Sequence, residues 1–159
     1  MNIEKTQSGI NIKIENSVNI FLDPVKISDG DVNIITDPQK SINHSKIFNL
    51  PGDYELNGVL IKGFDGEKYA FLIKDDVSVL CVAAALPQNT IDEIRENYGE
   101  IDCIISPEIS KPEILIEQFG IKIFITFNKP VKINDYSFEK TRFVKINPKK
   151  LSRASYFLE

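Results

Sequence analysis

The second half of the sequence alternates twice between a short apolar run and a helix-like pattern. Residues 101–106 and 122–127 are almost entirely apolar, which is typical of strands that are covered on both faces. The residues before each run repeat their apolar side chains at helical spacing, and the two patterns end at Gly99 and Gly120. Because a helix that links two strands of one sheet makes a right-handed crossover, this order predicts parallel strands with helices packed on them.

Both helix patterns begin with residues that favour a helix start. Thr90 and Glu93 have capping-box spacing, in which the glutamate side chain reaches back to the threonine backbone. Ser110 and Glu113 repeat this spacing, with Pro112 in the first turn. We therefore predict that the first helix is capped at Thr90 and the second at Ser110.

The first half of the sequence is predicted to consist of strands. Residues 10–14 alternate apolar and polar side chains, and residues 18–22 follow after turn-forming residues, which predicts a hairpin. Asp23 and Pro24 end the second strand, because proline lacks an N–H group and holds its neighbour extended. Other apolar runs predict strands at 32–36, 59–61, 69–73, 77–83, 141–146 and 154–158. The predicted class is α/β (α+β), with a β-rich first half and a βαβα second half in one domain, 1–159.

The composition is that of a globular protein without a membrane-spanning segment. The net charge of −4 argues against a general nucleic-acid binder, which is usually basic. No stretch of about 18 apolar residues occurs, and the opening residues show no signal-peptide pattern, so we expect a cytoplasmic protein. Cys81 and Cys103 lie within apolar runs and are predicted to be reduced thiols of the core.

Three segments occur in an order that is familiar from a known family. Residues 20–24 end a strand in Asp-Pro, and residues 30–36 form a turn followed by a short apolar strand. Residues 50–63 then carry a Pro-Gly-Asp-Tyr-Glu turn and a strand that ends in glycine, which is the most specific of the three segments. The basic strand before residues 147–151 extends the pattern to the C-terminus. In this order the segments resemble the small, lactonase-like branch of the metallo-β-lactamase superfamily, which implies a truncated αββα sandwich.

The metal ligands of that family are replaced in this sequence. The resemblance implies a His-x-His-x-Asp-His motif after the short apolar strand, in which imidazole and carboxylate groups bind zinc and activate a water molecule. Further ligands follow two later strands. With a single histidine in the chain, His44, we predict no metal, no cofactor and no catalytic residue at this vestigial site. The residues that stand at the ligand positions are Asp37, Gln39, Ser41, Ile42, Ala84 and Asn128.

We interpret the chain as a catalytically inactive member of this fold, a pseudoenzyme that serves as a binding scaffold. Its expected partner is an unidentified protein or a small molecule rather than a membrane or a nucleic acid, and a homo-oligomer is left open. One alternative is a metal-dependent hydrolase with an atypical carboxylate-based site. The acidic residues available to such a site are Asp23, Asp29, Asp31, Asp37 and Asp53.

A second alternative is a nucleic-acid-associated accessory protein. It is motivated by a basic run near the C-terminus, which on the plainer interpretation is a solvated strand face and turn. Binding of nucleic acid through this run would weaken with salt and on neutralising its lysines. The run contains Lys140, Arg142, Lys145, Lys149, Lys150 and Arg153.

Overall fold

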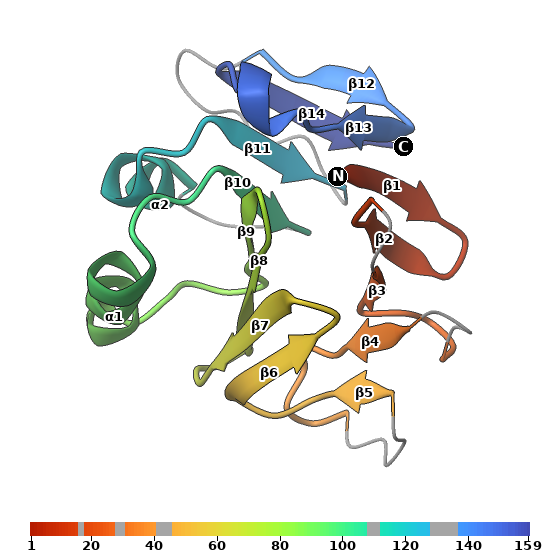
Figure 1. Ribbon diagram of the computed structural model, residues 1–159, viewed down its shortest axis with the longest axis vertical. Helices are drawn as coiled ribbons and strands as arrows, with labels where there is room; N and C mark the ends of the chain where they lie inside the picture. The colour runs from red at the N-terminus through yellow and green to blue at the C-terminus, as the bar shows by residue number, and fades with distance from the viewer. Residues whose placement is uncertain (16–17, 28–30, 41–45, 108–111, 128–136) are drawn as a thin grey trace.

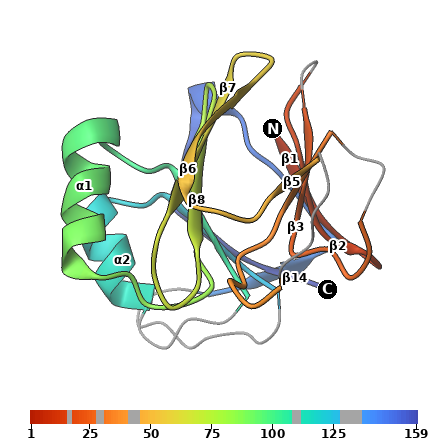
Figure 2. The same ribbon diagram turned by 90° about the horizontal axis from the view of Figure 1, so that it is seen from below.

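Two β-sheets pack face to face, and two α-helices cover the outer face of one of them (Figures 1 and 2). The computed structural model therefore confirms the predicted sandwich. On the outer face of the other sheet, the described part of the chain places no α-helix, which fits a truncated form of the αββα arrangement. The residues described by the structure are 1–15, 18–27, 31–40, 46–107, 112–127 and 137–159.

The first sheet has six strands in the order β13-β1-β2-β3-β4-β5. The predicted hairpin is confirmed, since β2 and β3 pair antiparallel with Ile12 opposite Ile20. The strand β1, which was not predicted, lies between β2 and β13, and β13 from the other end of the chain forms the edge of the sheet. The strands are β1 (Asn2–Thr6), β2 (Gly9–Lys13), β3 (Asn19–Leu22), β4 (Val32–Ile34), β5 (Ile47–Phe48) and β13 (Phe143–Lys145).

The second sheet has eight strands in the order β12-β14-β11-β10-β9-β8-β7-β6. From β12 to β9 all neighbouring strands are parallel, whereas β6 to β9 are joined antiparallel. The strand–helix alternation predicted the parallel pairing of β9, β10 and β11 but not that of β14 and β12. The strands are β6 (Gly52–Leu56), β7 (Val59–Phe64), β8 (Ala70–Lys74), β9 (Ser78–Cys81), β10 (Cys103–Ser106), β11 (Ile123–Thr126), β12 (Glu139–Thr141) and β14 (Ala154–Leu158).

The helices α1 (Gln88–Tyr98) and α2 (Pro112–Phe119) end as predicted, because Gly99 and Gly120 adopt positive φ angles of 75° and 64°. A short 3₁₀ helix, η1 (Pro148–Lys150), precedes β14. Neither α1 nor α2 combines the length and apolar character needed to cross a bilayer, and no other described helix does.

The predicted capping box at Thr90 is wrong. The N-cap is Pro87, which makes no side-chain cap, and its carbonyl accepts hydrogen bonds from the N–H groups of Thr90 and Ile91 at 3.1 Å. The helical turn is therefore already closed before Thr90, whose side chain is buried in the first turn. Ser110, the predicted cap of α2, lies outside the described residues.

The hydrophobic core has two layers, which follow from the alternation of side chains along the central strands. On β10, Ile105 faces the other sheet and Ile104 faces the helices, and on β11 the side chains of Ile125 and Phe124 divide in the same way. These strands are buried along their whole length. Burial on both faces explains why each strand opens with three consecutive apolar residues rather than an alternating pattern.

Candidate functional site

A pocket of about 470 Å³ lies at one end of the sandwich. It is formed by the residues that follow β3, β4, β9, β10 and β11, together with the loop before β8. The carboxyl ends of parallel strands are the usual position of binding sites in sheets of this kind. The lining residues are Asp23, Thr36, Asp37, Lys40, Lys68, Ala83, Pro107 and Phe127.

Asp23 joins the ends of β3 and β4 in the first sheet. Its carboxylate accepts two hydrogen bonds from Thr36, one from the backbone N–H at 2.8 Å and one from the hydroxyl at 2.6 Å. Its own N–H donates to the carbonyl of Ile34 at 2.8 Å. Asp23 has a positive φ of 45°, a conformation that aspartate adopts more readily than most residues. The Asp-Pro pair therefore ends β3 and also fixes the start of the loop after β4.

Asp37 forms an ion pair with Lys68 across the two sheets. The Lys68 ammonium lies 2.8 Å from one carboxylate oxygen, and the backbone N–H of Gln39 donates to the other at 3.0 Å. The Lys68 contact lowers the pKa of the Asp37 carboxyl below its usual value, with a further contribution from Gln39. Next to this pair, the N–H of Tyr69 donates to the carbonyl of Thr36 at 2.7 Å. The loop before β8 is thus attached to the loop after β4 by a charged and a neutral contact.

The other predicted positions of the vestigial site are only partly brought together. Gln39 is exposed and contributes its backbone N–H to Asp37. Ala84 is half-buried, but its neighbour Ala83 is the residue that lines the pocket. The positions outside the described residues are Ser41, Ile42 and Asn128, together with His44.

The acidic residues of the carboxylate alternative are not gathered at one place. Asp23 and Asp37 share the pocket, whereas Asp31 accepts a hydrogen bond at 2.8 Å from the backbone of Asn19, at the start of β3. Asp53 lies on β6 and forms an ion pair with Lys62 at 2.9 Å. Asp29 lies outside the described residues.

Sequence reasoning missed Lys68, Lys40 and Phe127 as residues of the pocket. Lys68 stands in a polar turn, where a lysine is the most ordinary surface residue, and it is far from Asp37 in the sequence. No spacing rule links the two positions, so the ion pair becomes visible only when the two sheets are assembled.

Both cysteines are buried core residues, as predicted. Cys81 and Cys103 are free thiols with no exposed surface, on the neighbouring strands β9 and β10. Burial raises the pKa of both thiols above the usual value, which keeps them protonated and poorly nucleophilic. They face the space between the sheets and contribute packing rather than chemistry.

No protein-family model and no curated protein matches the sequence. Among solved structures, the chain is similar to the crystal structure of a Thermotoga maritima protein assigned as a Zn-dependent hydrolase of the metallo-β-lactamase superfamily. The TM-score is 0.72 at 16% sequence identity, over 99% of this chain and 98% of that chain. The chain has the metallo-β-lactamase fold. The match extends over almost the whole of both chains.

The described residues of the pocket do not fit a zinc ion. Zinc sites in proteins use at least three side chains from His, Cys, Asp and Glu. Within the described ranges, no three such side chains are grouped so that they could hold a metal ion. Asp23 already accepts two hydrogen bonds from Thr36, and Asp37 is paired with the Lys68 ammonium. A cation bound at Asp37 would have to displace that ammonium or lie beside it.

The effect of the ion pair on the pKa of Asp37 can be tested with a variant of Lys68. Replacing Lys68→Gln is expected to raise the Asp37 pKa toward its usual value, because the ammonium is the largest cause of the lowering. Lys40→Gln is the matched control and should change this pKa less, since Lys40 is the weakest contributor. The measurement is a pH titration of the side-chain carboxyl carbon by NMR.

The sign of the linked stability follows from the direction of the shift. A carboxyl whose pKa is lowered by folding stabilises the native state above its unfolded pKa. This contribution is lost as the pH falls through the lowered value of the folded protein. The Lys68→Gln variant should therefore be less stable than the wild type at neutral pH, and the difference should disappear in acid. Equal pKa values for Asp37 in the wild type and in Lys68→Gln would contradict the ion pair.

Proposed function

We propose that the chain is a binding protein that uses the metallo-β-lactamase fold as a scaffold without metal-dependent hydrolysis. The observation that carries this proposal is the Asp37–Lys68 ion pair at 2.8 Å. Asp37 stands where the family resemblance places the first metal ligand, and a lysine ammonium already neutralises it. A fixed positive charge at this place opposes the binding of a divalent cation.

The chemistry of the pocket also favours binding over hydrolysis. Among its described lining residues, the ionisable groups are the carboxylates of Asp23 and Asp37 and the ammonium groups of Lys40 and Lys68. A hydrolase of this fold needs a metal-activated water, and a general base needs a pKa near the working pH. The lowered pKa of Asp37 makes this carboxylate a weaker base. The same four groups, with the apolar surfaces of Pro107 and Phe127, are suited to holding a polar partner.

Metal analysis of the purified protein tests this proposal. The chain is produced in medium supplemented with zinc, iron and manganese, and its metal content is measured by mass spectrometry. We expect well below one metal ion per chain, and no change in melting temperature on adding a chelator. The Thermotoga maritima protein, prepared in parallel, provides the comparison. A stoichiometric metal that is lost in Asp37→Ala would overturn the proposal, as would metal-dependent cleavage of lactone, phosphodiester or thioester substrates.

A further inference from the structure

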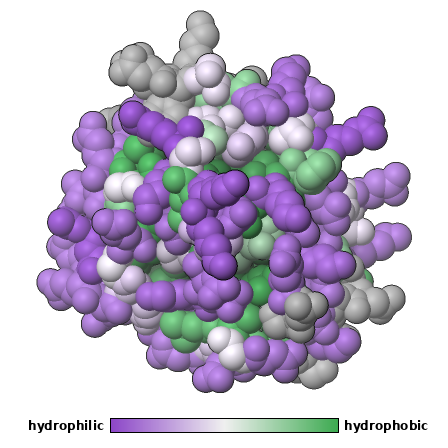
Figure 3. Space-filling model, turned by 45° about the horizontal axis from the view of Figure 1, so that its top comes forward, coloured by the Kyte–Doolittle hydropathy of each residue, from purple (hydrophilic) through white to green (hydrophobic). Residues whose placement is uncertain are grey.

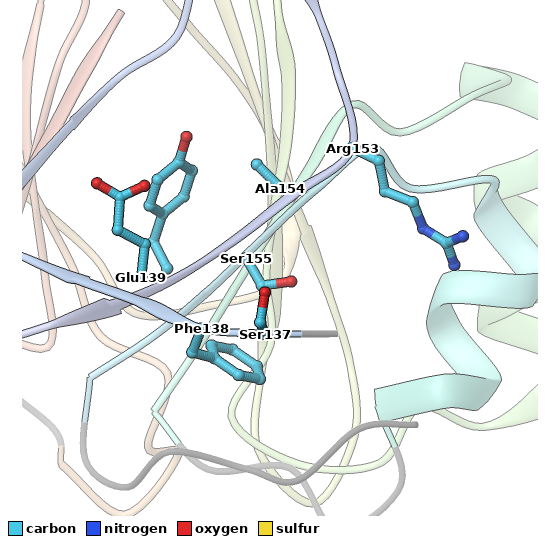
Figure 4. Close-up of a pocket in the computed structure, with 7 residues that line it drawn as sticks. Ser137, Phe138, Glu139, Arg153, Ala154 and Ser155 are labelled. Atoms are coloured by element: carbon cyan, nitrogen blue, oxygen red, sulfur yellow. The ribbon is translucent and has the colours of Figure 1, made fainter. Parts of the chain in front are cut away.

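A second cavity, of about 380 Å³, lies at the start of β14. This cavity adjoins the amino end of β14, whereas the Asp37 pocket adjoins the carboxyl end of β11. Because β11 and β14 are parallel, the two pockets lie at opposite ends of the sheet. Figure 3 brings the β12–β14 side forward and shows a mostly hydrophilic surface with apolar side chains exposed between the polar ones. The lining residues are Ser137, Phe138, Glu139, Arg153, Ala154, Ser155 and Tyr156 (Figure 4).

Ser155 carries a buried hydroxyl without a hydrogen-bond partner. The residue is 5% exposed, and its Oγ atom is shielded from water and makes no hydrogen bond. A polar group in this state costs free energy, and in native proteins it commonly marks a place where a water, an ion or a ligand binds. Serine side chains move between staggered positions, so a molecule in the adjoining cavity can pair with this hydroxyl.

Arg153 places a positive charge on the same side of β14 as the Ser155 hydroxyl. The two residues are separated by two positions in an extended segment, so their side chains leave on one face, and Figure 4 shows both directed toward the α2 side. Ser137, which is exposed, lines the same cavity and brings a second hydroxyl to it. Glu139, the one acidic side chain among the described residues that line the cavity, lies on the other side of β14 from Arg153.

An aromatic ring completes the cavity beside these polar groups. Phe138 is half-buried and packs edge-on against Phe124 of β11, with ring centroids 5.9 Å apart and an interplanar angle of 77°. The ring is held in place from the core side and offers its remaining surface to the cavity. Lys149 and Lys150 of η1 are exposed shortly before Arg153 and add positive charge near this end of β14.

We propose that this cavity binds the phosphate group of a small phosphorylated molecule. The Arg153 guanidinium pairs with the phosphate oxygens, for which its planar fork of N–H donors is suited. The hydroxyl groups of Ser155 and Ser137 donate to the same group, and Phe138 packs against the organic part of the ligand. The cavity volume lies within the range of about 300–1,000 Å³ that is usual for small-molecule sites. The inference does not depend on the proposal for the Asp37 pocket.

The test is an NMR titration of the ¹⁵N-labelled chain with phenyl phosphate, inorganic phosphate and phenol. Phenyl phosphate should shift the amides of residues 137–139 and 153–156 and bind more tightly than inorganic phosphate, whereas phenol should leave these amides unchanged. Arg153→Gln is expected to weaken binding at least about tenfold, because a charge-assisted pair is lost. Lys149→Gln removes the same charge from the nearby surface and should change the Kd by less than about twofold.

Ser155→Ala separates a binding role from a structural one. The variant should weaken phenyl phosphate about three- to tenfold, because one hydrogen bond to the ligand is lost. It should also raise the melting temperature of the free protein by about 2–4 °C, since an unpaired buried hydroxyl is removed. A melting temperature that falls together with unchanged affinity would overturn the proposal. The absence of amide shifts on adding phenyl phosphate would also overturn it. So would an equal loss of affinity in Arg153→Gln and Lys149→Gln that disappears at high salt, because this would indicate a diffuse basic surface for polyanions.

Discussion

Replacing Asp23 by alanine is expected to lower the free energy of unfolding by about 3 kcal/mol. The carboxylate accepts hydrogen bonds from both the N–H and the hydroxyl of Thr36, which is only 4% exposed. Alanine leaves these two donors buried and unpaired. It also gives up the tolerance of aspartate for the positive φ of 45° at this position. Urea unfolding followed by circular dichroism measures the loss.

Asp23→Asn is the matched variant, because it keeps the shape and the preference for a positive φ. The amide oxygen can still accept from the N–H of Thr36, but the amide nitrogen cannot accept from the hydroxyl. We expect a loss of about 1 kcal/mol, well below that of Asp23→Ala. If both variants lose the same amount, the charge rather than the hydrogen-bond geometry is responsible. A loss below about 1 kcal/mol in Asp23→Ala would contradict the role assigned to this residue.

Local patterns were sufficient to predict much of the fold. The alternation in residues 10–14 and 18–22 reports one buried and one exposed face, and the structure confirms this hairpin. The consecutive apolar residues of β10 and β11 indicated burial on both faces, and the two strands are parallel to each other and buried along their length. In each case the information lies within a few neighbouring residues, since the pattern of burial repeats along a single element.

Other features depend on contacts between distant parts of the chain and could not be predicted. The pairing of β1 with β13 joins the two ends of the sequence, and β1 has only one fully buried side chain, Ile3, to mark it as a strand. The start of α1 was misplaced because the spacing of Thr90 and Glu93 satisfies a capping pattern that the backbone does not use. For the candidate site, the family resemblance predicted which ligand positions are replaced, and this stays a prediction, whereas the contact of Lys68 with Asp37 becomes visible only in the assembled sheets.

Residues 50–63 carried most of the resemblance, and the glycines near the two ends of β7, Gly58 and Gly63, each have a physical reason. Asn57 and Gly58 form the tight turn between β6 and β7, both with positive φ, at 50° and 81°. Gly63 lies at the other end of the hairpin, paired with Gly52 on one side and Phe71 on the other. Glycine at position 58 suits the positive φ of the turn, whereas glycine at position 63 leaves room for the neighbouring atoms.

Gly63→Ala is expected to lower the free energy of unfolding by about 2–3 kcal/mol. A Cβ atom there would lie 2.9 Å from a ring carbon of Phe71, 3.0 Å from the carbonyl oxygen of Leu50 and 3.0 Å from the Cα of Pro51. Two of these three neighbours are backbone atoms, which cannot rotate away as a side chain can. The added methyl group therefore has to separate the start of β6 from β7, in a region where Phe71 is fully buried.

Gly58→Ala is the comparison that isolates the contribution of space. A Cβ at Gly58 meets nothing within 4 Å, so its cost is the positive φ alone, about 1 kcal/mol. Thermal unfolding of the two variants should therefore show the larger decrease for Gly63→Ala, even though Gly63 lacks the positive φ that strains Gly58→Ala. The double variant Gly63→Ala with Phe71→Leu should recover only part of the loss, because the contacts with Leu50 and Pro51 remain. A smaller decrease for Gly63→Ala than for Gly58→Ala would show that β6 and β7 do not approach as closely as this hairpin requires.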